Sequence, residues 1–264
     1  CVGYNAGVAI TTGDSNVAFG SNSLGACTTG AGNAALGYNA LLSLTTASNT
    51  VAVGDYALDA LTTGGANNAI GYAALGACTT GNTNDAFGHG ALTTVTTGTH
   101  NIGIGQSAGG LITTGTHNIS VGPQSGDAIT TGTYNVSMGA NAGSAITTGT
   151  HNVSMGYNAG ANVTTATYGI YIGNGAGNSA ITGAHNILMG HATGDAVTSG
   201  ANNVAIGPSC FTTATTAAGN VAIGNEALYY QTTAANNTAM GNGAGKAITT
   251  GANNVFVGYL AGTT

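Results

Sequence analysis

Four of the six histidines recur at one position of a repeating pattern, and they are the first residues to consider for chemistry. Imidazoles stacked at a fixed spacing can bind a metal ion, although a zinc site needs three or four converging ligands. Tyr134, Tyr168 and several Asn or Gly residues fill the same position elsewhere, which favours an outward row of side chains and no metal site. The four histidines are His100, His117, His151 and His185.

The acidic residues form no recurring pair, because they fall at several different positions of the pattern. Neither the carboxylate dyad of a glycosidase nor the Asp-rich repeat of a calcium-binding β-roll is indicated. Glycine-rich strings such as residues 173–177 look like phosphate-binding loops, but no P-loop lysine follows them. No Ser or Cys stands out as a nucleophile with a base and an orienting acid. The sequence therefore predicts a protein that is not an enzyme and that uses no cofactor.

The element that must position these side chains is a repeat of 17 residues, seen most clearly at residues 146–156. A fixed short period indicates one supersecondary unit stacked many times. It predicts a single continuous array over residues 1–264, without a linker. Each repeat closes on a glycine that permits a tight turn or a positive φ. These structural turn glycines are Gly3, Gly20, Gly37, Gly54, Gly71, Gly88, Gly105, Gly122, Gly139, Gly156, Gly173, Gly190, Gly207, Gly224, Gly241 and Gly258.

The residues before each closing glycine alternate large, small and large, as in Val204-Ala205-Ile206. This alternation is typical of a short strand whose apolar face is buried. A second apolar position, followed by Thr-Thr-Gly, predicts a second short strand and turn in each repeat. Seventeen residues are too few for two packed helices and suit one β-coil, which adds about 4.8 Å to a stack. The predicted fold is an all-β β-solenoid (β-roll or β-helix) of fifteen coils, on the order of 70 Å long and oligomeric or filament-forming.

An asparagine stands four residues before the closing glycine in 13 of 15 repeats, with Thr50 and Gly169 as the exceptions. Asn at one position of successive coils predicts a ladder of side-chain amides that satisfies buried turn backbone. The sequons at Asn118 and Asn152 offer N-glycosylation as an alternative, but they arise from the repeat itself. The predicted ladder consists of Asn16, Asn33, Asn67, Asn84, Asn101, Asn118, Asn135, Asn152, Asn186, Asn203, Asn220, Asn237 and Asn254.

The paired threonines, such as Thr113-Thr114, raise the alternative of an ice-binding solenoid, since a flat Thr array can order water. Ice-binding solenoids place two outward Thr per coil at i and i+2, whereas this sequence supplies i and i+1. Local hydrogen bonding by the hydroxyls is therefore favoured. A second alternative is a carbohydrate- or receptor-binding spike that uses outward rings at the turns. Its candidate contact residues are Tyr4, Tyr38, Tyr72, Tyr157, His100, His117, His151 and His185.

The composition excludes several classes of partner. Charged residues are 3% of the chain and Lys246 is the only cation, which excludes binding to nucleic acid. No apolar run of about 18 residues is present, so no membrane-spanning helix is predicted. Cys27, Cys78 and Cys210 stand at apolar positions of the repeat and are predicted to be small buried residues.

The strings 203–207 and 220–224, both Asn-Val-Ala-Ile-Gly, resemble the head repeats of YadA-like trimeric autotransporter adhesins. The string 37–41, Gly-Tyr-Asn-Ala-Leu, followed by Thr-Thr, is similar to glycine-rich β-repeats of phage and viral tail fibres. The resemblance implies a β-roll or β-solenoid, commonly a homotrimer, displayed outside the cell or on a virion. The departure is the period, because adhesin heads use a shorter repeat.

Residue and resemblance arguments together predict a structural fibre protein of the cell surface, extracellular matrix or virion. It is expected to assemble with itself, through stacking of solenoids or trimerisation, and to adhere to a host surface or glycan. Neither end of the sequence carries a distinct capping segment, so we expect a section of a longer fibre or a subunit that stacks end to end.

Overall fold

The computed structural model describes residues 1–263, and over these residues the chain is an all-β solenoid. The predicted fold class is confirmed. The described residues form fifteen strands of three residues each and contain no helix, so none is available that could cross a membrane. The chain divides into two compact units, an N-terminal unit of Cys1–Thr133 and a C-terminal unit of Tyr134–Thr264. The prediction of one continuous array stays a prediction.

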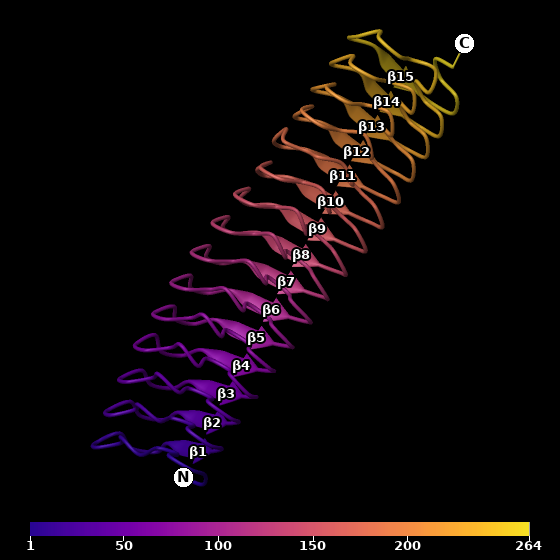
Figure 1. Cartoon of the computed structure of the whole chain (residues 1–264). Helices are drawn as coiled ribbons and strands as arrows, with labels where there is room; N and C mark the ends of the chain where they lie inside the picture. The colour runs from indigo at the N-terminus through magenta and orange to yellow at the C-terminus, as the bar shows by residue number, and fades with distance from the viewer. Residues whose placement is uncertain (264) are drawn as a thin grey trace. The chain divides into compact units, whose positions relative to one another are not determined.

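The strands of the N-terminal unit lie in one file, each paired in parallel with the next (Figure 1). Every pairing joins residues 17 apart, as Val17 with Ala34, so the repeat phase is also the register of the sheet. The strands are β1 (Val17–Phe19), β2 (Ala34–Leu36), β3 (Val51–Val53), β4 (Asn68–Ile70), β5 (Asp85–Phe87), β6 (Ile102–Ile104) and β7 (Ile119–Val121).

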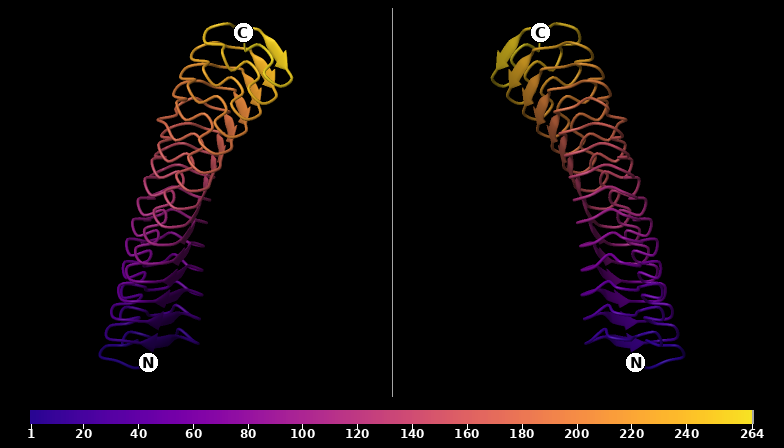
Figure 2. Two further views of the ribbon diagram at one scale, coloured as in Figure 1. Left: turned by 90° about the vertical axis from the view of Figure 1, so that its right-hand side faces the viewer. Right: turned by 90° about the vertical axis from the view of Figure 1, so that its left-hand side faces the viewer.

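The C-terminal unit repeats this arrangement with eight parallel strands in the same register. Figure 2 shows that each strand occupies one side of its coil while the rest of the coil returns by turns. The strands are β8 (Val136–Met138), β9 (Val153–Met155), β10 (Ile170–Ile172), β11 (Ile187–Met189), β12 (Val204–Ile206), β13 (Val221–Ile223), β14 (Thr238–Met240) and β15 (Val255–Val257).

The second strand predicted at Thr-Thr-Gly is absent from the described coils, and that prediction is wrong. The segment is a bend that bonds to the next coil mainly through its first threonine, as when Thr113 N–H donates to Thr130 O at 2.9 Å. A further bond, from Gly115 N–H at 3.2 Å, goes to the same Thr130 O, and bonds that converge on one carbonyl do not make a strand ladder. The glycine that follows turns the chain away before a second residue can pair in the same way.

Three corners bend each coil, and each corner residue adopts a left-handed backbone conformation. In the coil that starts at Gly139 they are Asn141, Gly143 and His151, with φ of 56°, 57° and 59°. Gly adopts this region freely, and Asn and His are enriched there among the other residues. The recurrent His and Tyr position is thus a corner of the coil.

The strands face the opposite way to the prediction, because the small central residue is the buried one. In β12, Ala205 is fully buried while Ile206 is 37% exposed. The interior of the coil is already occupied by other apolar positions, such as Leu75, Ile112 and Ala142, all fully buried. Where a leucine such as Leu75 fills the interior, only a small residue fits beside it, so the large residues of the strand point outward.

The core is packed by matching large residues against glycine between neighbouring coils. Leu92 lies against Gly103, where an added Cβ would come within 2.7 Å of its Cγ. Further along, the buried Tyr171 lies between Gly160 and Gly177, and its ring also fills the space beside Gly169. The absence of the ladder asparagine at residue 169 therefore follows from the tyrosine in the core.

This matching predicts strong coupling between Tyr171 and Gly177. Tyr171→Ala alone should lower the free energy of unfolding by about 3 kcal/mol through the cavity it leaves. Gly177→Leu alone should also destabilise, because its Cβ would lie 2.5 Å from Tyr171 Cδ1. The double variant should recover at least half of the summed loss, since it recreates a leucine beside a small strand residue. Guanidinium unfolding of all four proteins measures the coupling, and simple additivity would contradict the packing described.

Candidate interaction surface

The first and third residues of the strands form a surface that we call the outer face. It consists of apolar side chains in nearly every coil: Ile104 is 41% exposed, Ile206 37% and Met240 44%. Isolated exposed apolar residues are ordinary, but a contiguous apolar surface marks an interaction site. All four methionines of the sequence lie on the outer face, and their flexible thioethers adapt readily to a partner.

One polar pair interrupts the outer face of the N-terminal unit. Asn68, the first residue of β4, donates from Nδ2 to Oδ1 of Asp85, the first residue of β5, at 2.7 Å. Among the described strands Asp85 is the only charged residue, and Thr238 is the only other polar residue at the outer positions. The scattered acids were set aside in the sequence because no pair recurs. The signal for this pair is that two polar residues stand 17 apart in a column of Val and Ile.

The ladder asparagines lie inside the coils and hydrogen-bond from coil to coil. Asn101 Nδ2 donates to Gly115 O at 2.9 Å and to Asn84 Oδ1 at 3.1 Å, while its own Oδ1 accepts from Asn118 N at 3.0 Å. Most of the ladder is fully buried, and Asn16 and Asn254 at the outermost coils are partly exposed. Because Asn118 and Asn152 are buried, the folded coils do not present these sequons to solvent.

The closing glycines lie where the backbones of successive coils approach each other closely. At Gly207, φ is 134° and a Cβ would lie 2.6 Å from the carbonyl carbon of Gly224 in the next coil. The same contact recurs between Gly37 and Gly54 in the N-terminal unit. This column leaves no room for a side chain or a ligand and holds the outer face at its spacing.

The corner histidines and tyrosines stack on one another at the surface of each unit. His100 and His117 stack in the N-terminal unit, with ring centroids 4.7 Å apart and planes 4° apart. In the C-terminal unit His151 stacks between Tyr134 and Tyr168 at 4.9 Å from each, and Tyr168 stacks on His185 at 5.1 Å. The stacking covers the ring faces, so the rings present their edges to solvent. The described residues contain no group of three or more potential metal ligands.

The tyrosines after the closing glycines form a separate aromatic cluster in the N-terminal unit. Tyr38 and Tyr72 each pack edge-on against Tyr56, with centroids 5.4 and 5.9 Å from it, and Tyr72 stacks on His89 at 5.2 Å. Sequence reasoning missed Tyr56, which stands one position later in its repeat. Partial desolvation and the neighbouring phenols and carboxylates raise the pKa of Tyr56. Tyr4 and Tyr157 are exposed outside this cluster.

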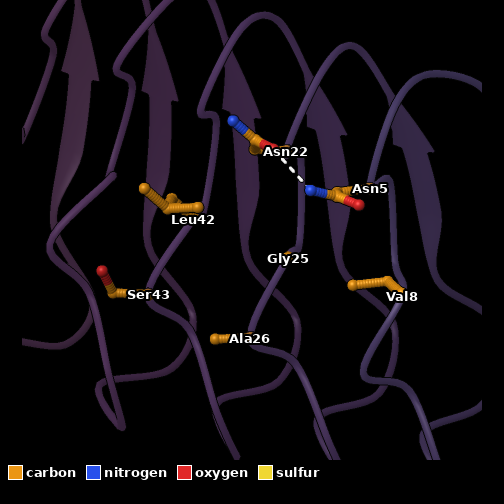
Figure 3. A pocket seen from close by; sticks show the side chains of 7 residues that line it. All are labelled: Asn5, Val8, Asn22, Gly25, Ala26, Leu42 and Ser43. Carbon is orange, nitrogen blue, oxygen red and sulfur yellow. Dashed lines mark hydrogen bonds between the residues drawn. The ribbon is translucent and has the colours of Figure 1, made fainter.

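A shallow groove of about 430 Å³ lies beside the turns of the first coils (Figure 3). It exists because Gly25 leaves a gap between the side chains of Val8 and Leu42. A surface amide row borders it, in which Asn5 Nδ2 donates to Asn22 Oδ1 at 3.3 Å. The lining holds no titratable group, and Ser43, its only hydroxyl, has no base beside it in the lining, so the groove suggests no chemistry.

The two threonine columns both lie toward solvent, because their segment is a bend and its residues do not alternate between faces. The first hydroxyl is used within the coil stack: Thr62 Oγ1 donates to Thr79 O at 2.9 Å. The second column, such as Thr63, is exposed.

The three cysteines predicted to be buried are buried and free. Burial raises the pKa of Cys78 to about 11 and that of Cys210 to about 12, so both remain thiols at neutral pH.

Comparison of the chain with protein-family models, with curated proteins and with solved structures found no match.

Proposed function

We propose that this protein is a structural fibre protein whose copies associate through the outer face. The observation that carries the proposal is the apolar surface running from coil to coil in both units, with Asp85 as the only charge among its strands. Leaving such a surface in water is unfavourable by roughly 25 cal/mol per Å² of apolar area. A chain with so few charged residues has little other means of keeping that surface solvated.

A second copy of the chain is the partner that fits this face best. Its ridges of side chains have the same coil spacing, so two outer faces can interdigitate as stacked sheets do. Seven strands of three residues give a flat area of roughly 330 Å² in the N-terminal unit, and eight give roughly 380 Å² in the C-terminal unit. Two copies that pair through their N-terminal units alone bury roughly 660 Å² of flat area, which is the size of a small, reversible protein interface.

Substitution of Ile104 by Lys tests this proposal. An ammonium buried against an apolar partner face should weaken association by about 100-fold, or ~3 kcal/mol. Lysine is chosen because it lowers the net negative charge of −6, so general repulsion between copies cannot explain the loss. Molar mass by light scattering across a dilution series measures the effect, and circular dichroism checks the fold.

The matched control is Thr97→Lys, which adds the same charge at an exposed bend away from the outer face. It should associate as the unsubstituted chain does. A chain that is monomeric at every concentration, or equal association of both variants, would contradict assembly through the outer face.

Localisation and adhesion rest on the resemblance to adhesin heads and tail fibres. We place the protein outside the cell, in the matrix or on a virion, where it would hold copies of itself together and contact a host surface or glycan. Catalysis, a cofactor and nucleic-acid partners form no part of the proposal, since no nucleophile with its base stands out and the chain holds one cation.

The two alternative functions have less support from the geometry. Ice binding would need free hydroxyls in two regular ranks, but the first threonine of each pair, such as Thr62, bonds to backbone. A glycan-binding spike would use open ring faces, but the rings of His151 and Tyr168 cover each other.

A further inference from the structure

The outer face alone does not fix how two copies align along their stacks. Every coil presents a similar apolar pair, so sliding one copy by one coil, about 4.8 Å, restores nearly the same contacts. Interfaces of this kind need a distinct element that sets one register, as a single buried polar residue does in a coiled coil. In the N-terminal unit that element is available at β4 and β5.

The Asn68–Asp85 pair breaks the repetition and has unused hydrogen-bonding capacity. The hydrogen bond within the pair, at 2.7 Å, uses one N–H of Asn68 and one oxygen of Asp85. The Asn68 amide has a second N–H, and the Asp85 carboxylate has a second oxygen. Burial of this pair under another apolar surface would leave those groups without partners, which is costly.

We propose that the Asn68–Asp85 pair fixes two copies antiparallel, about a twofold axis that passes between β4 and β5. The proposal rests on the association of copies through the outer face. Antiparallel packing about this axis lays β4 of each copy on β5 of the other. Asp85 then accepts one hydrogen bond from its own Asn68 and one from the partner's Asn68, and the twofold axis repeats the set.

The remaining strands of the unit support the same alignment. β3 lies on the partner's β6 and β2 on the partner's β7, so Val51 meets an apolar strand of the second copy. All these contacts are apolar on apolar. The polar rung is thereby enclosed by hydrophobic contacts on both sides, which excludes water from its hydrogen bonds.

Parallel packing serves the polar pair poorly. It keeps every coil level with its own counterpart, so Asp85 faces β5 of the other copy, whose outer residues are Phe87 and a second Asp85. Against the phenyl ring the carboxylate has no hydrogen-bond donor. Against the partner's Asp85 two like charges approach in a desolvated interface, which is unfavourable.

Spin-label distances distinguish the two arrangements. One label replaces the exposed Thr29, in the coil that leads to β2, and in a second protein it replaces the exposed Thr80, before β5. Both carry Cys1→Ser, since the other three cysteines are buried. In the antiparallel pair the axial separation between copies is about 24 Å at residue 29 and about 5 Å at residue 80. In any parallel, in-register assembly both labels give the same distance.

Longer separation at residue 29 than at residue 80, measured by double electron–electron resonance on spin-diluted samples, is the expected result. Equal separations in an associated protein would overturn the antiparallel alignment and leave the proposed function standing. A monomer by light scattering would overturn both.

The double variant Asn68→Val/Asp85→Val tests the role of the pair. It should still associate but give a broadened distribution of label distances at residue 29, because the register is lost. Thr238→Val, a polar-to-apolar change on the outer face of β14, is the control and should keep a narrow distribution of label distances at residue 29. A narrow distribution in the double variant would overturn the role of the pair.

Discussion

Replacement of Gly207 by alanine is expected to lower the free energy of unfolding of the C-terminal unit by more than about 4 kcal/mol. Two independent costs combine. The backbone at residue 207 has φ of 134°, a region that L-residues rarely adopt. The new Cβ would also lie 2.6 Å from the carbonyl carbon and oxygen of Gly224, which belong to backbone and cannot rotate away. Relief requires the two coils to separate, which breaks the parallel hydrogen bonds between β12 and β13.

Gly175→Ala in the same unit is the matched control. Residue 175 has φ of 65° and no atom within 4 Å of an added Cβ, so only the left-handed conformation is penalised. The expected loss is about 1 kcal/mol. Guanidinium unfolding followed by circular dichroism measures both variants. Equal losses would show that the distance between coils at the closing glycines does not limit the fold.

Replacement of Asn203 by leucine, a side chain of similar size, is expected to cost about 3–5 kcal/mol. Its Nδ2 donates to Ala217 O at 2.8 Å, and its Oδ1 accepts from Asn220 N at 3.0 Å. Leucine leaves that carbonyl and that N–H buried without partners, at about 1–3 kcal/mol each. It also removes the amide bonds to Asn186 and Asn220 along the ladder.

Asn162→Leu serves as the control for the ladder variant. Asn162 is exposed, and its amide bond to Asn178 is at the surface, so its loss should change stability by no more than about 0.5 kcal/mol. Thermal unfolding of the two variants beside the unsubstituted chain makes the comparison. If both asparagines cost the same, burial of the ladder would not be what makes Asn203 important.

The solenoid could be predicted from the sequence because the period alone defines the register. Any two residues 17 apart, such as Val17 and Ala34, must be neighbours on adjacent coils. Rows of like residues on successive coils could therefore be predicted without knowledge of the backbone. The stack of His100 on His117 is one such row. The period does not define the shape of a single coil. That shape determines which side of each strand faces inward, which the period alone does not predict.

Which side of the strand faces inward depended on the width of the coil. Alternation in Val204-Ala205-Ile206 identifies two faces, and hydrophobicity favours burying the larger side chains. The interior, however, already holds residues such as Leu75 and Ile112, so Ala205 is the one that fits. The sequence could have indicated this, because two columns of the repeat have complementary volumes: glycine or alanine in one column accompanies a large residue in the other. The pair Leu92 and Gly103 is an example.

The matching of large residues with glycine in the core also limits how the array can grow by duplication. Residues 54–70 carry Leu58 and Ala69, and the coils on either side carry the same combination, so a copied coil there would find compatible neighbours. Residues 156–172 carry Tyr171, which needs glycine at both Gly160 and Gly177. Gly160 and Gly177 stand 17 residues apart, at the same position of the repeat, so a tandem copy of that coil keeps a glycine on each side of every tyrosine. The same coil copied to a place before one that carries leucine at this position, such as Leu58, would bring the tyrosine ring against a leucine side chain. The coil with Tyr171 can therefore be duplicated in place but not moved along the array.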